Sequence, residues 1–142
     1  MSAENVEAVS QMFETFCRAT WESGEWLSGY DRGVVYHPRE DELDTRECVG
    51  REAWARIVAG FMDAFSEITF DVDDTHDGGD WAIVSTVLHG RGGASGVDVN
   101  DRYVFAYRMR DGLVVEGWEY HTMDAALAAV RERLSSPADT TG

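Results

Sequence analysis

The chain has 142 residues and a formal net charge of −15 at pH 7. A chain of this length forms one domain and buries roughly 70% of the surface that its unfolded state exposes, which is enough for a hydrophobic core. Such an acidic chain repels phosphate backbones, so we expect no nucleic-acid partner, although surface acids also serve solubility alone. The apolar runs are too short to cross a bilayer and the first residues lack a signal-peptide pattern. We therefore expect a cytoplasmic protein with no membrane partner.

The first part of the chain has helical periodicity. Apolar residues recur at three- and four-residue steps and predict one amphipathic helix over residues 3–22. The predicted buried face consists of Val6, Val9, Phe13, Phe16 and Thr20, with Cys17 beside them. Ser23 and Gly24 end this helix. A short helical turn over residues 25–31 and a short strand over residues 34–38 follow.

A charged loop over residues 39–48 leads to a second helix over residues 51–65. Beyond this helix the period changes to that of a strand, first over residues 67–74. The turn at 77–80 leads into a strand over residues 81–90, and the turn at 110–112 joins strands over residues 102–110 and 113–121. The buried face of the second helix is predicted to consist of Trp54, Ile57, Val58, Phe61 and Phe65.

The glycine-rich segment 91–96 predicts a bend or β-bulge, because it lacks the Gly-Lys-Ser/Thr ending of a phosphate-binding loop. A last helix over residues 123–134 begins after Thr122, which is a suitable N-cap. We expect a single domain over residues 1–134 and a frayed tail over residues 135–142. Because helices come first and strands later, the order of elements predicts an α+β fold.

The two cysteines, Cys17 and Cys48, have no zinc-type spacing and form no CxxC pair. Cys17 falls within the helical pattern as a small core residue, whereas Cys48 lies in the charged loop, where its role is open. No pair of histidines has metal-ligand spacing on a helix. We therefore expect neither a metal site nor a cofactor.

Five segments carry a family resemblance through their order and spacing. They are WESGEW, VVYHPRE, VGREAW, HGRGGASGVDV and YRMRDGLVVEGWEYHTMDAALAAV. In these segments the chain resembles the SnoaL-like branch of the nuclear transport factor 2-like superfamily, which includes polyketide cyclases and ketosteroid isomerases. The resemblance implies a cone, a cystatin-like α+β barrel in which a curved antiparallel sheet wraps around the N-terminal helix. It also implies a hydrophobic pocket and a homodimer, but the same cone serves several chemistries and leaves the function open.

Glu119 and His121 are spaced two residues apart, so a strand would direct both side chains to one face. Aligned on the turn glycine Gly112, the resemblance implies that Gly117 and Glu119 face the pocket, with Glu119 where epoxide hydrolases carry an acid. Desolvation in an apolar cone disfavours the charged carboxylate, which suits acid/base work near neutral pH. The alternative is that Glu119 pairs with an arginine or completes a hydrogen-bond network.

His37 precedes Pro38, and the resemblance implies that it holds the place of the general base of ketosteroid isomerases. An imidazole suits proton transfer near neutral pH, but a histidine hydrogen-bonded at the rim would fit the sequence equally well. His89 shares a strand face with Trp81 and Ile83, and the sequence does not decide whether that face points inward.

Tyr103, Phe105 and Tyr107 share one strand face. By the resemblance, Phe105 stands where ketosteroid isomerases carry their oxyanion-stabilising acid, so this chain lacks the familiar residue. The three rings are interpreted either as an aromatic pocket wall with phenol donors or as packed core. Together with Trp26, Tyr30 and Gly117 they form the expected substrate-binding set.

Two functions are open at this point. The first is a cofactor-free enzyme that catalyses cyclisation, isomerisation or dehydration of a small, apolar, carbonyl-bearing molecule. In that enzyme His37 would be the base, and Glu119 with His121 would act as the acid or would orient the base. The second is a non-catalytic ligand-binding or dimerisation module of the same fold.

Overall fold

The computed structural model describes residues 2–39 and 47–135. Its elements are helices α1 (Ser2–Glu14) and α2 (Arg18–Ser23), a 3₁₀ helix η1 (Glu25–Gly29), strands β1 (Tyr30–His37) and β2 (Cys48–Val49), helix α3 (Arg51–Met62), strands β3 (Phe65–Gly78), β4 (Trp81–Gly92), β5 (Asp98–Arg110) and β6 (Leu113–Tyr120), and helix α4 (Met123–Ser135). This order confirms the predicted α+β class. Most of the expected charged loop and of the expected tail lie outside the described residues. No helix in the described part of the chain is both long and apolar enough to span a membrane.

The predicted first helix is in fact two helices, α1 and α2. The backbone at Cys17 is extended, with φ −157° and ψ 177°. The Cys17 N–H donates to the Thr20 hydroxyl oxygen at 3.0 Å, and the Thr15 hydroxyl donates to the Gln11 carbonyl at 2.8 Å. Side chains that compete for backbone hydrogen bonds in this way end one helix and begin the next. Gly24, in the left-handed region at φ 80°, ends α2 as predicted.

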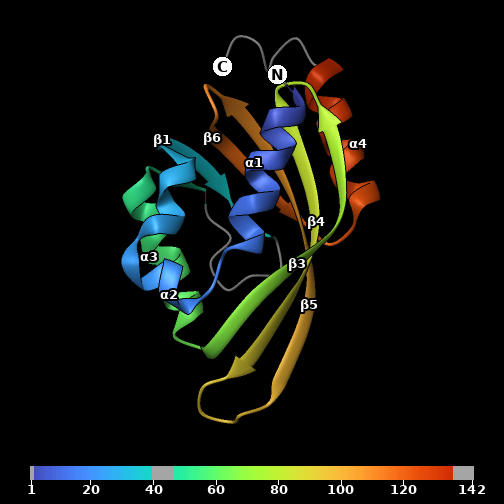
Figure 1. Ribbon diagram of the computed structural model, residues 1–142. Coiled ribbons are helices and arrows are strands. Elements are labelled where there is room, and N and C mark those ends of the chain that lie inside the picture. The colour runs from blue at the N-terminus through green and yellow to red at the C-terminus, as the bar shows by residue number, and fades with distance from the viewer. Residues whose placement is uncertain (1, 40–46, 136–142) are drawn as a thin grey trace.

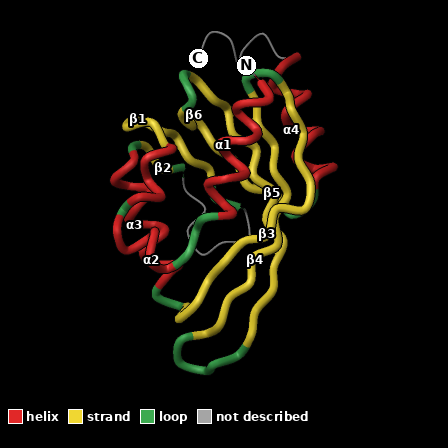
Figure 2. The backbone as a smooth tube through the Cα atoms, in the orientation of Figure 1, coloured by secondary structure: helices red, strands yellow, loops and turns green. Residues whose placement is uncertain are grey.

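The six strands form one curved sheet in the order β2-β1-β6-β5-β4-β3, and the sheet does not close on itself (Figures 1 and 2). The long strands β3 to β6 pair antiparallel, as expected, and so do β1 and β2, whereas β1 runs parallel to β6. Phe65 begins β3 instead of ending the second helix, and Tyr30 begins β1 instead of completing a helical turn. Strands β3 and β5 are longer than predicted.

The two faces of the sheet pack against different helices. Figure 1 shows α1 across one face, which we call the inner face, and α4 against the other, the outer face. Strand alternation divides β5 between them: Phe105 joins the core under α1, whereas Val104 and Ala106 join the core under α4. The Phe13 ring of α1 stacks on Phe105 with centroids 4.2 Å apart. The Thr122 hydroxyl accepts the Ala125 N–H at 3.1 Å, which confirms the predicted N-cap.

Candidate functional site

A cavity of about 1020 Å³ lies between the inner face of the sheet and the helices α1 and α3. This volume falls at the upper end of the range that is typical of small-molecule sites. The lining is mainly aromatic and aliphatic, and its aromatic members include Phe13, Trp26, Tyr30, Trp54, Phe105 and Tyr107. Such a surface suits a ligand that is largely apolar.

Glu119 of β6 lines this cavity, opposite Phe105 in the β5·β6 ladder. The Tyr36 hydroxyl donates a hydrogen bond to Glu119 Oε2 at 2.7 Å, and the backbone N–H of Arg39 donates to Oε1 at 3.1 Å. Hydrogen bonds to a carboxylate are stronger than those between neutral groups, so these two donors fix the acid's orientation.

The bond from Tyr36 to Glu119 is the first of three. The Tyr36 and Tyr107 hydroxyl oxygens lie 3.0 Å apart, and those of Tyr107 and Tyr30 also lie 3.0 Å apart. Burial raises the pKa of Tyr30 to about 12, and burial likewise raises the pKa values of Tyr36 and Tyr107 well above 10. The three phenols therefore stay protonated at neutral pH and connect to Glu119 as a neutral hydrogen-bonded chain, which we call the tyrosine chain.

Gly117 makes the tyrosine chain sterically feasible. It pairs with Tyr36 of β1 on one side and with Tyr107 of β5 on the other. A Cβ atom at this position would lie 2.8 Å from Tyr107 Cε1 and 2.9 Å from Tyr36 Cε2, closer than real Cβ contacts. Gly117 does not line the cavity itself. Its role in the structure is to let two tyrosine rings meet over the strand.

Trp54 of α3 contacts two members of the tyrosine chain, Tyr30 and Tyr36. Its indole packs face to face on the Tyr36 ring, with centroids 3.6 Å apart. The buried Nε1–H has no hydrogen-bond partner within the described chain. It interacts with the Tyr30 hydroxyl, which partly offsets the rise in the pKa of Tyr30 that burial causes, although the geometry falls short of a full hydrogen bond. A buried donor in this state is costly unless a ligand or a water accepts from it.

Arg39 was not singled out from the sequence, although it holds the backbone next to Glu119. The residue is 5% exposed, and the guanidinium carbon lies 4.0 Å from the centroid of the Tyr103 ring. The guanidinium donates to Asp101 Oδ2 at 2.9 Å and to the Arg102 carbonyl at 2.8 Å. The only sequence signal was a basic residue directly after Pro38.

His37 does not line the cavity, so its expected pocket position is corrected. Its ring stacks on Trp118 with centroids 4.6 Å apart, and Nε2 lies 2.9 Å from Glu116 Oε2. Tyr36 points inward, and because neighbouring residues of a strand face opposite ways, His37 points outward. His121 follows the last residue of β6 and is exposed, so it does not share the cavity with Glu119.

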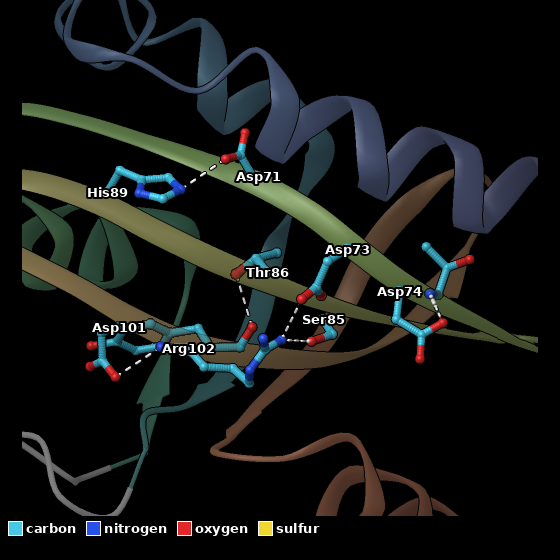
Figure 3. A network of polar contacts seen from close by, with 10 residues as sticks. Asp71, Asp73, Asp74, Ser85, Thr86, His89, Asp101 and Arg102 are labelled. Carbon is cyan, nitrogen blue, oxygen red and sulfur yellow. Dashed lines mark hydrogen bonds and ion pairs between the residues drawn. The ribbon is translucent and has the colours of Figure 1, made fainter.

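The outer face also carries His89, which settles the open question of its direction. Figure 3 shows it beside Asp71, with His89 Nε2 2.8 Å from Asp71 Oδ2. In the same view Arg102 donates to Asp73 Oδ2 at 2.7 Å and to the Ser85 hydroxyl at 2.6 Å. These residues form a polar surface on the side of the sheet opposite the cavity.

Cys48 belongs to β2 instead of a loop, is buried, and lines the cavity. Hydrogen bonds from Thr20 lower the pKa of the Cys17 thiol, which lies outside the cavity. Among residues 2–39 and 47–135, no three histidine, cysteine or acidic side chains gather in a way that could hold a metal ion.

The sequence model of the SnoaL-like domain matches residues 7–117, which is more than half of the chain. The chain therefore belongs to the SnoaL-like family. No curated protein matches it.

Three solved structures show how widely this fold is shared. A candidate SnoaL-like polyketide cyclase from Jannaschia sp. CCS1 is 19% identical with a TM-score of 0.66, over 96% of this chain and 95% of that one. IdmH, a candidate polyketide cyclase from Streptomyces antibioticus, is 20% identical with a TM-score of 0.66, over 87% and 98%. An NTF2-like protein of unknown function from Burkholderia pseudomallei K96243 is 13% identical with a TM-score of 0.70, over 90% and 95%. At these identities the similarity shows the fold alone.

Proposed function

We propose that the protein binds a small, largely apolar, carbonyl-bearing molecule in the cavity and transfers a proton between that molecule and Glu119. The observation that carries this proposal is a carboxylate in an aromatic cavity, with Oε2 held by the Tyr36 hydroxyl and Oε1 by the Arg39 N–H. A carboxylate held in this way in the cavity wall is positioned to accept a proton from a ligand. The names of two similar structures, candidate polyketide cyclases, agree with this class of substrate.

In the proposed step, Glu119 removes a proton from a carbon next to the carbonyl group. The C–H bond breaks, its electron pair enters the enolate, and Glu119 becomes a carboxylic acid. Return of the proton to another atom of the enolate gives an isomerisation. In a cyclisation the enolate carbon would instead attack a second carbonyl of the same molecule, and Glu119 would give its proton to the new alkoxide. In a dehydration the enolate would expel a β-hydroxyl group, which would take the proton from Glu119 and leave as water. A positioned acid/base group of this kind contributes about 10²–10⁴-fold to the rate.

The step can be tested before the natural substrate is known. The probe is 2-acetylnaphthalene, whose methyl protons exchange with D₂O through an enolate and are followed by proton NMR. We expect the protein to accelerate this exchange, and Glu119→Gln to reduce the acceleration by about 100-fold or more while the ketone still binds. The control is Glu67→Gln, which makes the same change at an exposed position of β3.

Exchange as fast in Glu119→Gln as in the unmodified protein would show that Glu119 is not the proton acceptor. Binding of the ketone with no acceleration in any variant would instead favour the non-catalytic ligand-binding alternative. One feature supports that alternative: both oxygens of Glu119 already accept hydrogen bonds within the protein.

A further inference from the structure

We infer that the tyrosine chain reports the protonation state of Glu119 to the far part of the cavity, where it sets whether Tyr30 offers a ligand a hydrogen-bond donor or an acceptor. The inference rests on the proposed function only in taking Glu119 as the group that gains and loses a proton. It adds a second ligand-binding position at Tyr30 and Trp54, where the protonation state of Glu119 determines which ligand group is bound.

The direction of the chain follows from counting hydrogens. Each phenol has one hydrogen and accepts through its oxygen. When Glu119 is a carboxylate, Tyr36 gives its hydrogen to Oε2, so Tyr107 must donate to Tyr36 and Tyr30 must donate to Tyr107. All three hydrogens are then used, and the Tyr30 oxygen has only lone pairs to offer.

Protonation of Glu119 reverses this order. When the added hydrogen lies on the Oε2 lone pair that faces Tyr36, it is donated to the Tyr36 oxygen, while Oε1 still accepts the Arg39 N–H. Tyr36 then donates to Tyr107, and Tyr107 to Tyr30. The hydrogen of Tyr30 becomes the free one. No phenol gains or loses a net proton, in keeping with the burial that raises the pKa values of all three.

The indole of Trp54 supplies a second donor that cannot reverse. Its buried Nε1–H makes no hydrogen bond of good geometry within the described residues, and Trp54 and Tyr30 both line the cavity. With Glu119 ionised, the pair offers one donor and one acceptor, which suits a ligand hydroxyl. With Glu119 protonated, the pair offers two donors, which suits a carbonyl or an enolate oxygen.

This arrangement points to a conjugated substrate. Two hydroxyl groups separate Glu119 from Tyr30, so a single ligand would reach both ends only if its acidic carbon and its oxygen were joined through several atoms. In such a molecule, transfer of a proton from the ligand carbon to Glu119 leaves a negative charge, which the conjugated system carries to the ligand oxygen. The same event turns Tyr30 into a donor toward that oxygen, so proton transfer and charge stabilisation are coupled.

Glu119 is surrounded by other titratable and charged groups. Those that face it or share its cavity are Tyr36 and Tyr107 of the chain, Arg39 beside it, and Glu47, Cys48 and Arg56 in the cavity lining. Because these groups would complicate a pH titration, the test uses substitutions at constant pH.

Glu119→Gln imitates the protonated state. The Arg39 N–H requires an acceptor, so the amide oxygen takes the place of Oε1 and the amide NH₂ donates to Tyr36.

The second substitution is Tyr36→Phe, which interrupts the tyrosine chain at a residue that is buried but does not line the cavity. Four proteins are compared: unmodified, Glu119→Gln, Tyr36→Phe and the double variant. The control is Tyr120→Phe, which removes a tyrosine hydroxyl on the α4 side of the sheet.

Two readouts are measured. The first is the ratio of dissociation constants of 2-acetylnaphthalene, an acceptor, and 2-naphthol, a hydroxyl ligand, by calorimetry. We expect Glu119→Gln to shift this ratio about tenfold in favour of the ketone, the value of one hydrogen bond. The second needs no ligand: with ¹³Cζ-labelled tyrosine, Glu119→Gln should move the NMR resonance of Tyr30, assigned with Tyr30→Phe.

Both effects should vanish when Tyr36→Phe is present and persist in Tyr120→Phe. A Tyr30 resonance or a binding ratio that does not respond to Glu119→Gln would overturn the inference, even if Glu119 catalyses exchange. A response that survives Tyr36→Phe would show that the coupling runs by another route, and this also overturns it. Loss of exchange with an intact Tyr30 response would reject the proposed function and leave the tyrosine chain standing.

Discussion

The ring of Tyr36 lies face to face on the indole of Trp54, with centroids 3.6 Å apart and planes inclined by 15°. Both rings are buried, and they connect α3 to β1 directly behind the acid of the cavity. The stack therefore contributes to stability and fixes the position of the Tyr36 hydroxyl at the same time.

Replacement of Trp54 should separate these two contributions. Trp54→Phe keeps a ring against Tyr36 and removes an N–H group without a partner in the described chain, so we expect a loss of about 1–3 kcal/mol in the free energy of unfolding. Trp54→Ala removes the ring and should cost about 3–5 kcal/mol. Urea-induced unfolding measures both. Equal losses would mean that ring packing is not what stabilises this contact.

Gly117→Ala should destabilise the protein by about 1–3 kcal/mol, because the new methyl group overlaps the rings of Tyr36 and Tyr107. Gly60→Ala is the matched control, since a Cβ at that helical position meets no atom within 4 Å. The control should raise stability by up to about 1 kcal/mol, the usual preference of a helix for alanine over glycine. The comparison uses thermal and urea unfolding, and a harmless Gly117→Ala would contradict the close packing of the two tyrosines.

The buried phenols predict a loss of stability at high pH. Below pH 10 the folded and unfolded states both hold the Tyr30 proton, and the stabilisation is complete. Between about 10 and 12 only the unfolded state releases it, so the free energy of unfolding falls, by about 3 kcal/mol for a shift of this size. Unfolding in urea between pH 8 and 11.5 checks this. Tyr30→Phe should show a shallower fall, and an equal fall in both proteins would refute the assignment.

Arg39→Met should lower stability by roughly 1–3 kcal/mol, because it removes the cation that is bonded to Asp101 and packed on Tyr103. Arg91→Met removes the same charge from an exposed pair with Asp98 and should cost no more than about 1 kcal/mol. Only Arg39→Met should also weaken ketone binding in the cavity, since Arg39 positions the N–H that holds Glu119. Equal effects of the two substitutions in unfolding experiments would argue against a structural role for Arg39.

The alternation of residues in the last two long strands was enough to predict which side chains share a face. Tyr103, Phe105 and Tyr107 lie together on the inner face, and Glu119 lies beside them across the ladder. These strands are joined by a tight turn, so their register is a local property of the chain. The α+β class follows from the same local patterns.

The tyrosine chain could not be found in this way. Tyr36 and Glu119 are 83 positions apart and meet only because β1 pairs in parallel with β6, which no local pattern encodes. The prediction that His37 lines the pocket was wrong for a different reason. The resemblance suggested a base before the proline, but the alternation Val34, Tyr36 already assigned the inward positions of that short strand to its neighbours.

The strand β3 forms one outer margin of the sheet over 14 residues, with backbone groups on one side that no strand of this chain pairs with in the described structure. A margin of that length would ordinarily recruit strands from other molecules and lead to aggregation. Here it is interrupted by two irregularities in register and carries the acids Glu67, Asp71, Asp73, Asp74 and Asp77. Mutual repulsion between these charges opposes strand addition, so these five of the chain's 27 acidic residues also protect the sheet margin from edge-to-edge association.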